Sequence, residues 1–259
     1  MPSRRCGAKK KLPAEEGGRF ARRMAFKHWP LVRDIRFAQK CGRYLRGARK
    51  RRPELNWDEF LRIARHFKLD DMGSFPERGY LFQLASDLPD GAQVVEVGSW
   101  MGASTCFIAG GLKGGAAKIV AVDNFKGLST CGEDAAWYNR HFRKLGAQST
   151  LEIFRENFAD LGFTSRAEPV VNDSLAAAKQ LAVKRGTIDF IFIDGDHSYA
   201  ACKADIEAWA PFVKRGGVIA FHDFGSRADG VTRAIFEETK AGRFAEIVGV
   251  AGTIIAFRM

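Results

Sequence analysis

Residues 188–223 read IDFIFIDGDHSYAACKADIEAWAPFVKRGGVIAFHD and predict a strand, a helix and a second strand. Each of the two apolar runs ends in acidic or histidine residues, and apolar runs of this length are typical of buried strands. The segment between them carries large side chains at helical spacing: Tyr199, Cys202, Ile206, Trp209 and Val213. This order predicts two parallel strands joined by a crossover helix.

The same alternation extends on both sides of this unit. Strands are predicted at 92–98, 118–123, 167–171, 188–194 and 216–223, and helices at 103–112, 150–162, 174–184 and 231–240. Two further strands, within 243–250 and 253–259, are joined by a glycine-containing turn and predict an antiparallel hairpin. The expected fold class is α/β: a Rossmann-like, doubly wound, mostly parallel sheet of seven strands with a C-terminal antiparallel hairpin.

Acidic residues stand at or just beyond the carboxyl ends of the predicted parallel strands: Glu96, Asp123, Asp173, Asp194 and Asp223. Ligands of parallel α/β sheets bind beyond these ends of the strands. The acids therefore predict a binding site along this edge of the sheet.

Charge separates the N-terminal segment from the rest of the chain. Residues 1–53 hold 18 Lys and Arg against three acids, whereas the remainder holds 23 against 27. We expect a basic segment over 1–55, disordered in 1–18 and with an amphipathic helix beginning near Leu31. The second part is a domain over 56–259, whose residues 56–90 form a helical cap with helices at 56–67 and 77–88.

Cysteine usage and hydropathy favour a cytoplasmic protein. The five cysteines lack metal-ligand or redox spacing, which favours reduced thiols. No apolar stretch reaches the roughly 18 residues of a membrane span. Aromatic residues such as Trp29 and Phe37 alternate with cations in residues 1–53, which suits peripheral contact with an anionic membrane. Nucleic acid is the less favoured partner of this segment, because the rest of the chain is acidic.

The loop after the first predicted strand, VEVGSWMGAST (95–105), suits close approach of a ligand. Gly98 and Gly102 let the backbone come near a bound molecule, and the next helix offers free N–H groups. The G-x-G-x-x-G pattern of dinucleotide sites is missing its second glycine. Asp123, at the end of the next strand, suits the two hydroxyls of a ribose. A tight strand-to-helix turn is the alternative explanation of the glycine pair taken alone.

Together these motifs resemble the class I S-adenosylmethionine (SAM)-dependent methyltransferases over residues 92–259. VEVGSWMGAST is similar to the first motif of that class, VAVDNF (120–125) to the second, and the C-terminal hairpin to its reversed seventh strand. Residues 192–224 resemble the small-molecule O-methyltransferases of the macrocin and mycinamicin type and, more distantly, the catechol and caffeoyl-CoA type. The resemblance does not cover residues 1–55.

The resemblance implies a site for SAM. Gly98 and the backbone through Gly102 would pass the methionine part, Ser104 would bind its carboxylate, and Asp123 would hold the ribose. Asp173 and Ser174 would flank the adenine. The residues assigned to the cofactor are Glu96, Gly98, Ser99, Trp100, Gly102, Ser104, Asp123, Asp173 and Ser174.

The resemblance also implies a divalent metal, with Asp194 and Asp223 as its ligands. Carboxylates suit Mg²⁺, which would lower the pKa of a substrate hydroxyl. The sequence departs from the sugar-modifying enzymes of this type, which have two consecutive acids where this chain has His222 and Asp223.

The candidate catalytic residues are Asp194, His197 and His222. The two histidines are general bases, metal ligands or hydrogen-bonded supports, and the sequence leaves these alternatives open. Asp196 is expected to cap the helix that follows it. Residues 124–149 are expected to form a lid with Trp137, Tyr138, His141 and Phe142, the alternative being a surface helix.

These expectations point to a SAM-dependent methyltransferase that methylates an oxygen atom of a small-molecule or sugar-containing acceptor, with Mg²⁺ assistance left open. A homo-oligomer is compatible with the sequence. One rival is methylation of RNA or protein, with the basic segment holding the partner. Another is a binding protein that keeps the fold without catalysis, and a related hydroxylase is a third.

Overall fold

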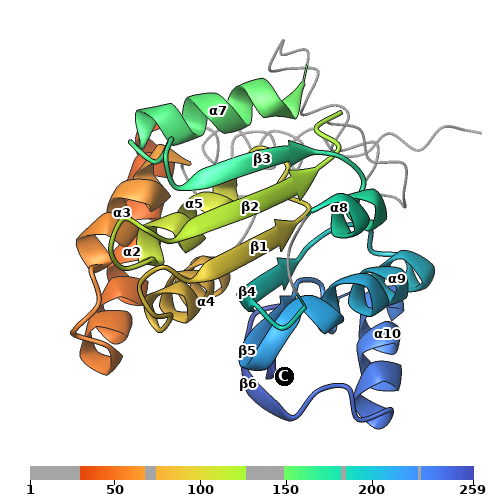
Figure 1. Cartoon of the computed structure of the whole chain (residues 1–259). Coiled ribbons are helices and arrows are strands. Elements are labelled where there is room, and N and C mark those ends of the chain that lie inside the picture. The colour runs from red at the N-terminus through yellow and green to blue at the C-terminus, as the bar shows by residue number, and fades with distance from the viewer. Residues whose placement is uncertain (1–29, 68–73, 127–148, 182–184, 227–228) are drawn as a thin grey trace, which may run out of the picture. The chain divides into compact units, whose positions relative to one another are not determined.

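The computed structural model describes residues 30–67, 74–126, 149–181, 185–226 and 229–259 (Figure 1). The chain divides into two compact units, Met1–Gly47 and Ala48–Met259. Helix α2 (Pro30–Arg51) runs through the boundary between these units, and the sheet with its covering helices lies in the second. In the described part of the chain, no helix is both long and apolar enough to span a membrane.

Seven strands form one sheet in the order β3-β2-β1-β4-β5-β7-β6. The strands are β1 (Gln93–Val97), β2 (Lys118–Asp123), β3 (Ala167–Val171), β4 (Ile188–Ile193), β5 (Val213–Phe221), β6 (Glu246–Ala251) and β7 (Ile254–Arg258). The first five are parallel, and β7 pairs antiparallel with both β5 and β6. The Rossmann-like, mostly parallel sheet with a C-terminal antiparallel hairpin is therefore confirmed.

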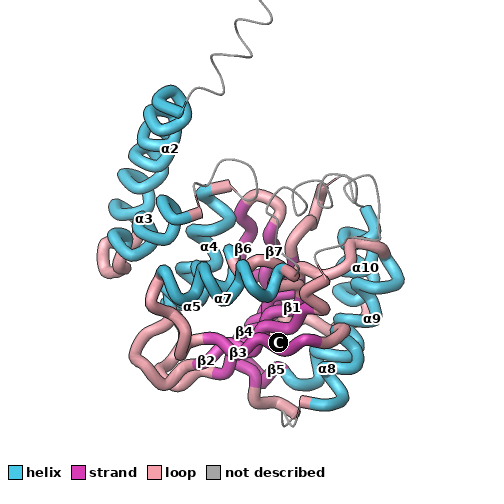
Figure 2. The backbone as a smooth tube through the Cα atoms, turned by 90° about the horizontal axis from the view of Figure 1, so that it is seen from above, coloured by secondary structure: helices cyan, strands magenta, loops and turns pink. Residues whose placement is uncertain are grey.

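Helices cover both faces of the sheet, as Figure 2 shows. One face carries α8 (Ser174–Gln180), α9 (Tyr199–Trp209) and α10 (Asp229–Lys240). A short 3₁₀ turn at Ala210–Phe212 follows α9 directly in the chain. The other carries α4 (Phe75–Ser86), α5 (Ala103–Gly111) and α7 (Thr150–Asp160), with α3 (Trp57–His66) against α5. Every residue of β4 is buried, as expected for a central strand covered on both faces.

Two predicted boundaries are displaced for identifiable reasons. Helix α4 begins at Phe75, ahead of the predicted start, because Ser74 and Glu77 form a reciprocal capping box and a proline occupies its first turn. Strand β5 begins at Val213 rather than 216, because Val213 already pairs with Ile188 before the register shifts. The pairing resumes at Val218, beyond the glycines that had marked the expected start.

Candidate functional site

Backbone hydrogen bonds place the residues that follow the parallel strands side by side. The Asp194 N–H donates to the Val97 carbonyl over 2.8 Å, and the His222 N–H donates to the Ile193 carbonyl over 3.1 Å. The Gly98 N–H donates to the Val122 carbonyl over 2.8 Å. Each bond continues the pairing one residue past a strand end, so these residues share the carboxyl edge of the sheet.

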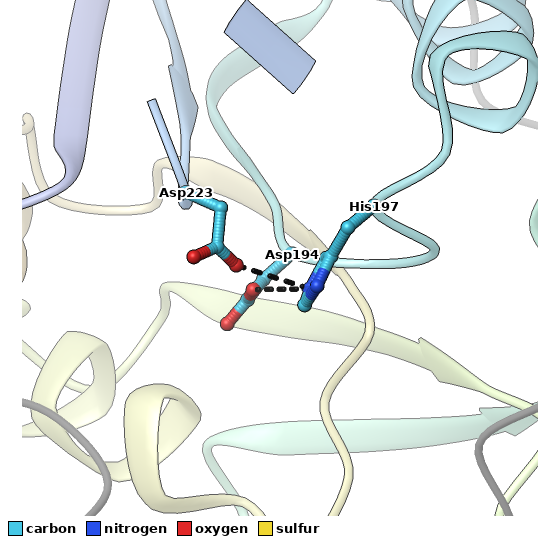
Figure 3. Close-up of side chains that lie close together, drawn as sticks. All are labelled: Asp194, His197 and Asp223. Atoms are coloured by element: carbon cyan, nitrogen blue, oxygen red, sulfur yellow. Dashed lines mark ion pairs between the residues drawn. The ribbon is translucent and has the colours of Figure 1, made fainter. Parts of the chain in front are cut away.

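Two aspartates and two histidines meet at this edge, and Figure 3 shows three of them. His197 Nε2 lies 3.1 Å from Asp223 Oδ2 and 3.8 Å from Asp194 Oδ1. His222 Nδ1 lies 3.1 Å from Asp223 Oδ2 and 3.2 Å from Asp194 Oδ1. All four were candidate catalytic or metal-binding residues, and the structure brings them into one cluster.

The charges in this cluster shift one another's pKa values. Burial alone would raise the pKa of Asp194, but the neighbouring His222 and His197 hold it well below its ordinary range. Burial would likewise lower the pKa of His222, but the charge of Asp194 and hydrogen bonds to Asp194 and Asp223 raise it to about 10. The carboxylates of Asp194 and Asp223 raise the pKa of His197. The cluster therefore pairs its carboxylates with the imidazolium of His222.

Three of these side chains offer a suitable donor set for a divalent ion. One ligand atom each of Asp194, His197 and Asp223 can be chosen so that all lie within 4.8 Å of one another. Two carboxylate oxygens and an imidazole nitrogen fit a divalent cation, and the nitrogen favours Mn²⁺ or a similar ion over Mg²⁺. Asp194 Oδ1 and Asp223 Oδ2 also face His222 Nδ1, so these oxygens would contact both the cation and the His222 ring.

Two residues that sequence reasoning missed hold His222 from its other side. The Thr253 hydroxyl lies 3.3 Å from His222 Nε2 and 3.0 Å from Glu77 Oε1. The Thr253 N–H donates to the same Glu77 oxygen over 2.8 Å. Glu77 is the third residue of α4 and completes the capping box with Ser74, and Thr253 lies in the turn between β6 and β7. The S-x-x-E capping pattern was readable in the sequence, but nothing in it indicated the contact with that turn.

The first glycine loop has a constrained backbone. Gly98, Trp100 and Gly102 have φ values of +87°, +45° and +83°, in the left-handed region that favours glycine. A Cβ atom on Gly98 would overlap the carbonyl group of Asp194, so the loop after β1 lies directly against the loop after β4. The predicted cofactor loop and the acid–histidine cluster are therefore neighbours.

Asp123 ties this loop to the end of β2. Its Oδ2 accepts a hydrogen bond from the Trp100 N–H over 2.8 Å, and its Oδ1 accepts one from the Phe125 N–H over 2.7 Å. Burial raises the pKa of Asp123, while these two N–H groups lower it. Each oxygen keeps a second lone pair, and the residue is only partly buried. The carboxylate therefore has capacity for two ligand hydroxyls.

Glu96, also assigned to the cofactor, lies inside the domain. Its side chain is fully buried and accepts a hydrogen bond from the Thr105 hydroxyl of α5. Burial raises its pKa to about 7, while the nearby hydroxyl groups of Ser104, Thr105 and Ser99 lower it. The carboxyl group thus links β1 to the loop and helix that follow it.

The residues predicted to flank adenine have separate local partners. Asp173 caps α8, with its Oδ1 accepting from the Ala176 N–H over 2.9 Å. The Ser174 hydroxyl bonds with Asp205 and accepts from the Trp209 indole N–H over 2.8 Å. Next to them Val171 and Leu175 are exposed, at 58% and 40%. Both are apolar side chains open to solvent, and the sequence reasoning did not single them out.

Asp196 was expected to cap the helix that follows it, but the capping residue of α9 is Ser198, whose hydroxyl accepts from the Ala201 N–H. Asp196 accepts from the Ser198 N–H over 2.8 Å, in the turn ahead of the helix. Most of the predicted lid, residues 124–149, lies outside the described residues, including Trp137, Tyr138, His141 and Phe142. Residues 1–18, expected to be disordered, also lie outside them.

Comparison with known families gives a match to the model of a methyltransferase domain over residues 95–224. This range covers the cofactor loop, Asp123, and every member of the acid–histidine cluster. Glu77 and Thr253 fall outside it.

Solved structures share the fold at low identity. An O-methyltransferase from Bacillus cereus in complex with SAH is 20% identical, with a TM-score of 0.53, and the match covers 78% of this chain and 90% of that one. The SAH-bound methyltransferase PaMTH1 from Podospora anserina is 14% identical, with a TM-score of 0.52, and the match covers 98% and 99%. The O-methyltransferase NovP is 19% identical, with a TM-score of 0.54, and the match covers 71% and 80%. At these identities the likeness establishes the fold.

Proposed function

The chain belongs to the methyltransferase-domain family, and from this premise we propose that it transfers the methyl group of SAM to an oxygen atom of a small-molecule or sugar-containing acceptor. The observation that carries the proposal is the contact between two loops. The glycine loop, tied to Asp123, lies against the loop that bears Asp194. A cofactor on the first loop and an acceptor at the second would then be adjacent.

The described residues fit SAM at this edge. The spare lone pairs of Asp123 suit the two ribose hydroxyls, and the N–H groups at the start of α5 suit the methionine carboxylate. Val171 and Leu175 offer an apolar surface beside Asp173, where the adenine would lie. When bound, SAM supplies the electrophilic methyl group and leaves as S-adenosylhomocysteine.

The acid–histidine cluster would orient the acceptor hydroxyl, and the proton of that hydroxyl would pass to His197 in its neutral form. Asp194 and His197 are both partly exposed and face a common point, which suits binding an acceptor oxygen. His222 faces both carboxylates and is held by Thr253 on its other side, so we assign it a positioning role. A divalent ion held by Asp194, His197 and Asp223 would lower the pKa of the acceptor hydroxyl. Holding the hydroxyl in line with the methyl group is the larger contribution expected of the protein.

Replacing Asp123 tests the cofactor assignment. Asp123→Ala removes both proposed ribose bonds, and we expect the affinity for S-adenosylhomocysteine to fall by roughly 100-fold, as for two lost bonds to a charged group. Isothermal titration calorimetry measures it directly. Asp160→Ala, which removes an exposed acid at the end of α7, is the control and should bind as the wild type does. Unchanged affinity in a folded Asp123→Ala protein would contradict the assignment.

We further propose that the basic N-terminal segment holds the protein at anionic membranes. In α2 the residues Arg36, Lys40, Arg43 and Lys50 recur at helical spacing, so they lie on one side of the helix, and all four are exposed. Each such cation near an anionic bilayer contributes about 1 kcal/mol of binding. A helix with several of them suits reversible, salt-sensitive attachment.

Charge reversal in α2 should abolish this attachment. We expect the full-length protein to co-sediment with phosphatidylserine vesicles at low salt and the triple variant Arg36→Glu, Lys40→Glu, Arg43→Glu to remain in the supernatant. Phosphatidylcholine vesicles are the lipid control, and S-adenosylhomocysteine affinity should be the same in both proteins. If the wild-type protein does not bind anionic vesicles but binds RNA with a steep salt dependence, the membrane proposal is wrong and a nucleic acid is the partner of this segment.

A further inference from the structure

The glycine loop is supported by a side chain from a helix distant in the sequence. Asn157 of α7 donates from Nδ2 to the Met101 carbonyl over 2.9 Å, at the centre of the loop. A Cβ atom on Gly102 would come within 2.7 Å of Phe154, one turn earlier in the same helix. The Phe154 and Phe158 rings stack at 4.5 Å and form the surface under Gly102. Helix α7 therefore holds the loop through one directed bond and one apolar contact.

Asn157 is itself held by a histidine of α3. His66 Nε2 lies 2.8 Å from Asn157 Oδ1. One turn earlier, Arg62 donates to the Leu161 carbonyl at the end of α7 over 3.0 Å. Two side chains of α3 thus fix α7 at points one turn apart.

The chemistry of these groups gives the chain of hydrogen bonds a single direction. A carbonyl oxygen only accepts, so the Asn157 amide must present its NH₂ to Met101. The amide oxygen then faces His66, which must donate from Nε2. Neutral His66 with its proton on Nε2 satisfies this pattern, and so does the protonated ring. Reversing the Asn157 amide would set two acceptors against each other at Met101, so the donor order fixes the rotamer of Asn157.

We propose that Asn157 and His66 are positioning residues of the cofactor site, which set the conformation of the Ser99–Gly102 loop before the cofactor binds. The inference rests on the proposed SAM site. Trp100, within this loop, holds a φ of +45°, which is costly for a bulky residue and is kept only when its surroundings impose it. Asp123 fixes the loop at the Trp100 N–H, and Asn157 fixes it at the next carbonyl.

Calorimetry with S-adenosylhomocysteine tests the proposal on the full-length protein. Asn157→Leu keeps the size of the side chain and removes both hydrogen bonds, and we expect at least about fivefold weaker binding. His66→Leu should weaken binding by a smaller factor, while His66→Gln, which can still donate to Asn157, should restore it to within about twofold of the wild type. Glu156→Gln, at an exposed position beside Asn157 on α7, is the matched control.

Hydrogen exchange separates positioning from general stability. Peptides that cover Ser99–Thr105 should exchange faster in Asn157→Leu, whereas peptides from α9 should keep their wild-type rate. Unchanged affinity in a folded Asn157→Leu protein, or equal loss in His66→Leu and His66→Gln, would overturn the proposal. Wild-type protein that does not bind S-adenosylhomocysteine at all would overturn the proposed function together with this inference.

Discussion

Gly98→Ala is expected to destabilise the protein by roughly 3–5 kcal/mol and to abolish measurable cofactor binding, because two costs add at this position. The backbone of Gly98 is in the left-handed region, at φ +87°. An added Cβ atom would overlap the Asp194 carbonyl, which is backbone and cannot rotate away. The loops after β1 and β4 would have to separate, and both carry the proposed site. Urea unfolding and calorimetry measure the two effects.

A substitution at a second glycine separates the cost of the atomic overlap from the cost of the left-handed backbone. Gly242 has a φ of +74°, but nothing lies within 4 Å of the position that its Cβ would take. Gly242→Ala should therefore cost only about 1–2 kcal/mol, the usual cost of a left-handed alanine. It should leave the affinity for S-adenosylhomocysteine unchanged. Equal destabilisation by the two substitutions would show that the contact with Asp194 contributes nothing.

Asp194→Asn is expected to weaken divalent-metal binding. The substitution keeps the shape of the side chain but removes the charge that faces His197 and His222. A neutral amide oxygen is a much weaker ligand than a carboxylate, so we expect at least about tenfold weaker binding of Mn²⁺. Electron paramagnetic resonance measures free Mn²⁺ directly and requires no acceptor. With an acceptor in hand, EDTA should stop methyl transfer by the wild type, and added Mg²⁺ or Mn²⁺ should restore it.

The neighbouring acid is the matched control for this substitution. Asp196 is exposed and accepts a hydrogen bond from the Ser198 N–H, and an asparagine accepts that bond equally well. Asp196→Asn should bind Mn²⁺ as the wild type does. Should Asp194→Asn retain wild-type affinity, or the wild type bind no Mn²⁺, the metal proposal fails. The cluster would then act through its own carboxylates and imidazoles.

The central strands were predictable because burial on both faces leaves a simple pattern. Phe190 to Ile193 form a continuous apolar run, and the acid that follows marks the end of the strand. Asp194 and Asp223 were predictable as partners for the same reason, since parallel strands end at one edge. The predicted start of β5 was less exact. Its first residue pairs with β4 ahead of two glycines, and such glycines usually mark a turn.

Contacts between distant segments were not predictable. Thr253 and Glu77 are 176 residues apart, and the sequence placed them only at the start of a strand and at the start of a helix. Only the packing of α4 against the hairpin shows that both support His222. Ser174, which is predicted to lie beside the adenine, shows the same limit. Its hydroxyl bonds with Asp205 and Trp209 on α9, and no spacing rule indicates these partners.

The order of strands in the sheet has a consequence for folding during synthesis. Strand β7 lies between β5 and β6, although it is the last of the seven strands to emerge from the ribosome. Until then, one edge of β5 remains open along Val218–Phe221, the residues that β7 later pairs with. An open apolar edge strand is a template for pairing with another chain. The nascent protein therefore exposes this edge to other chains until β7 pairs with β5. Thr253 reaches His222 only after that pairing.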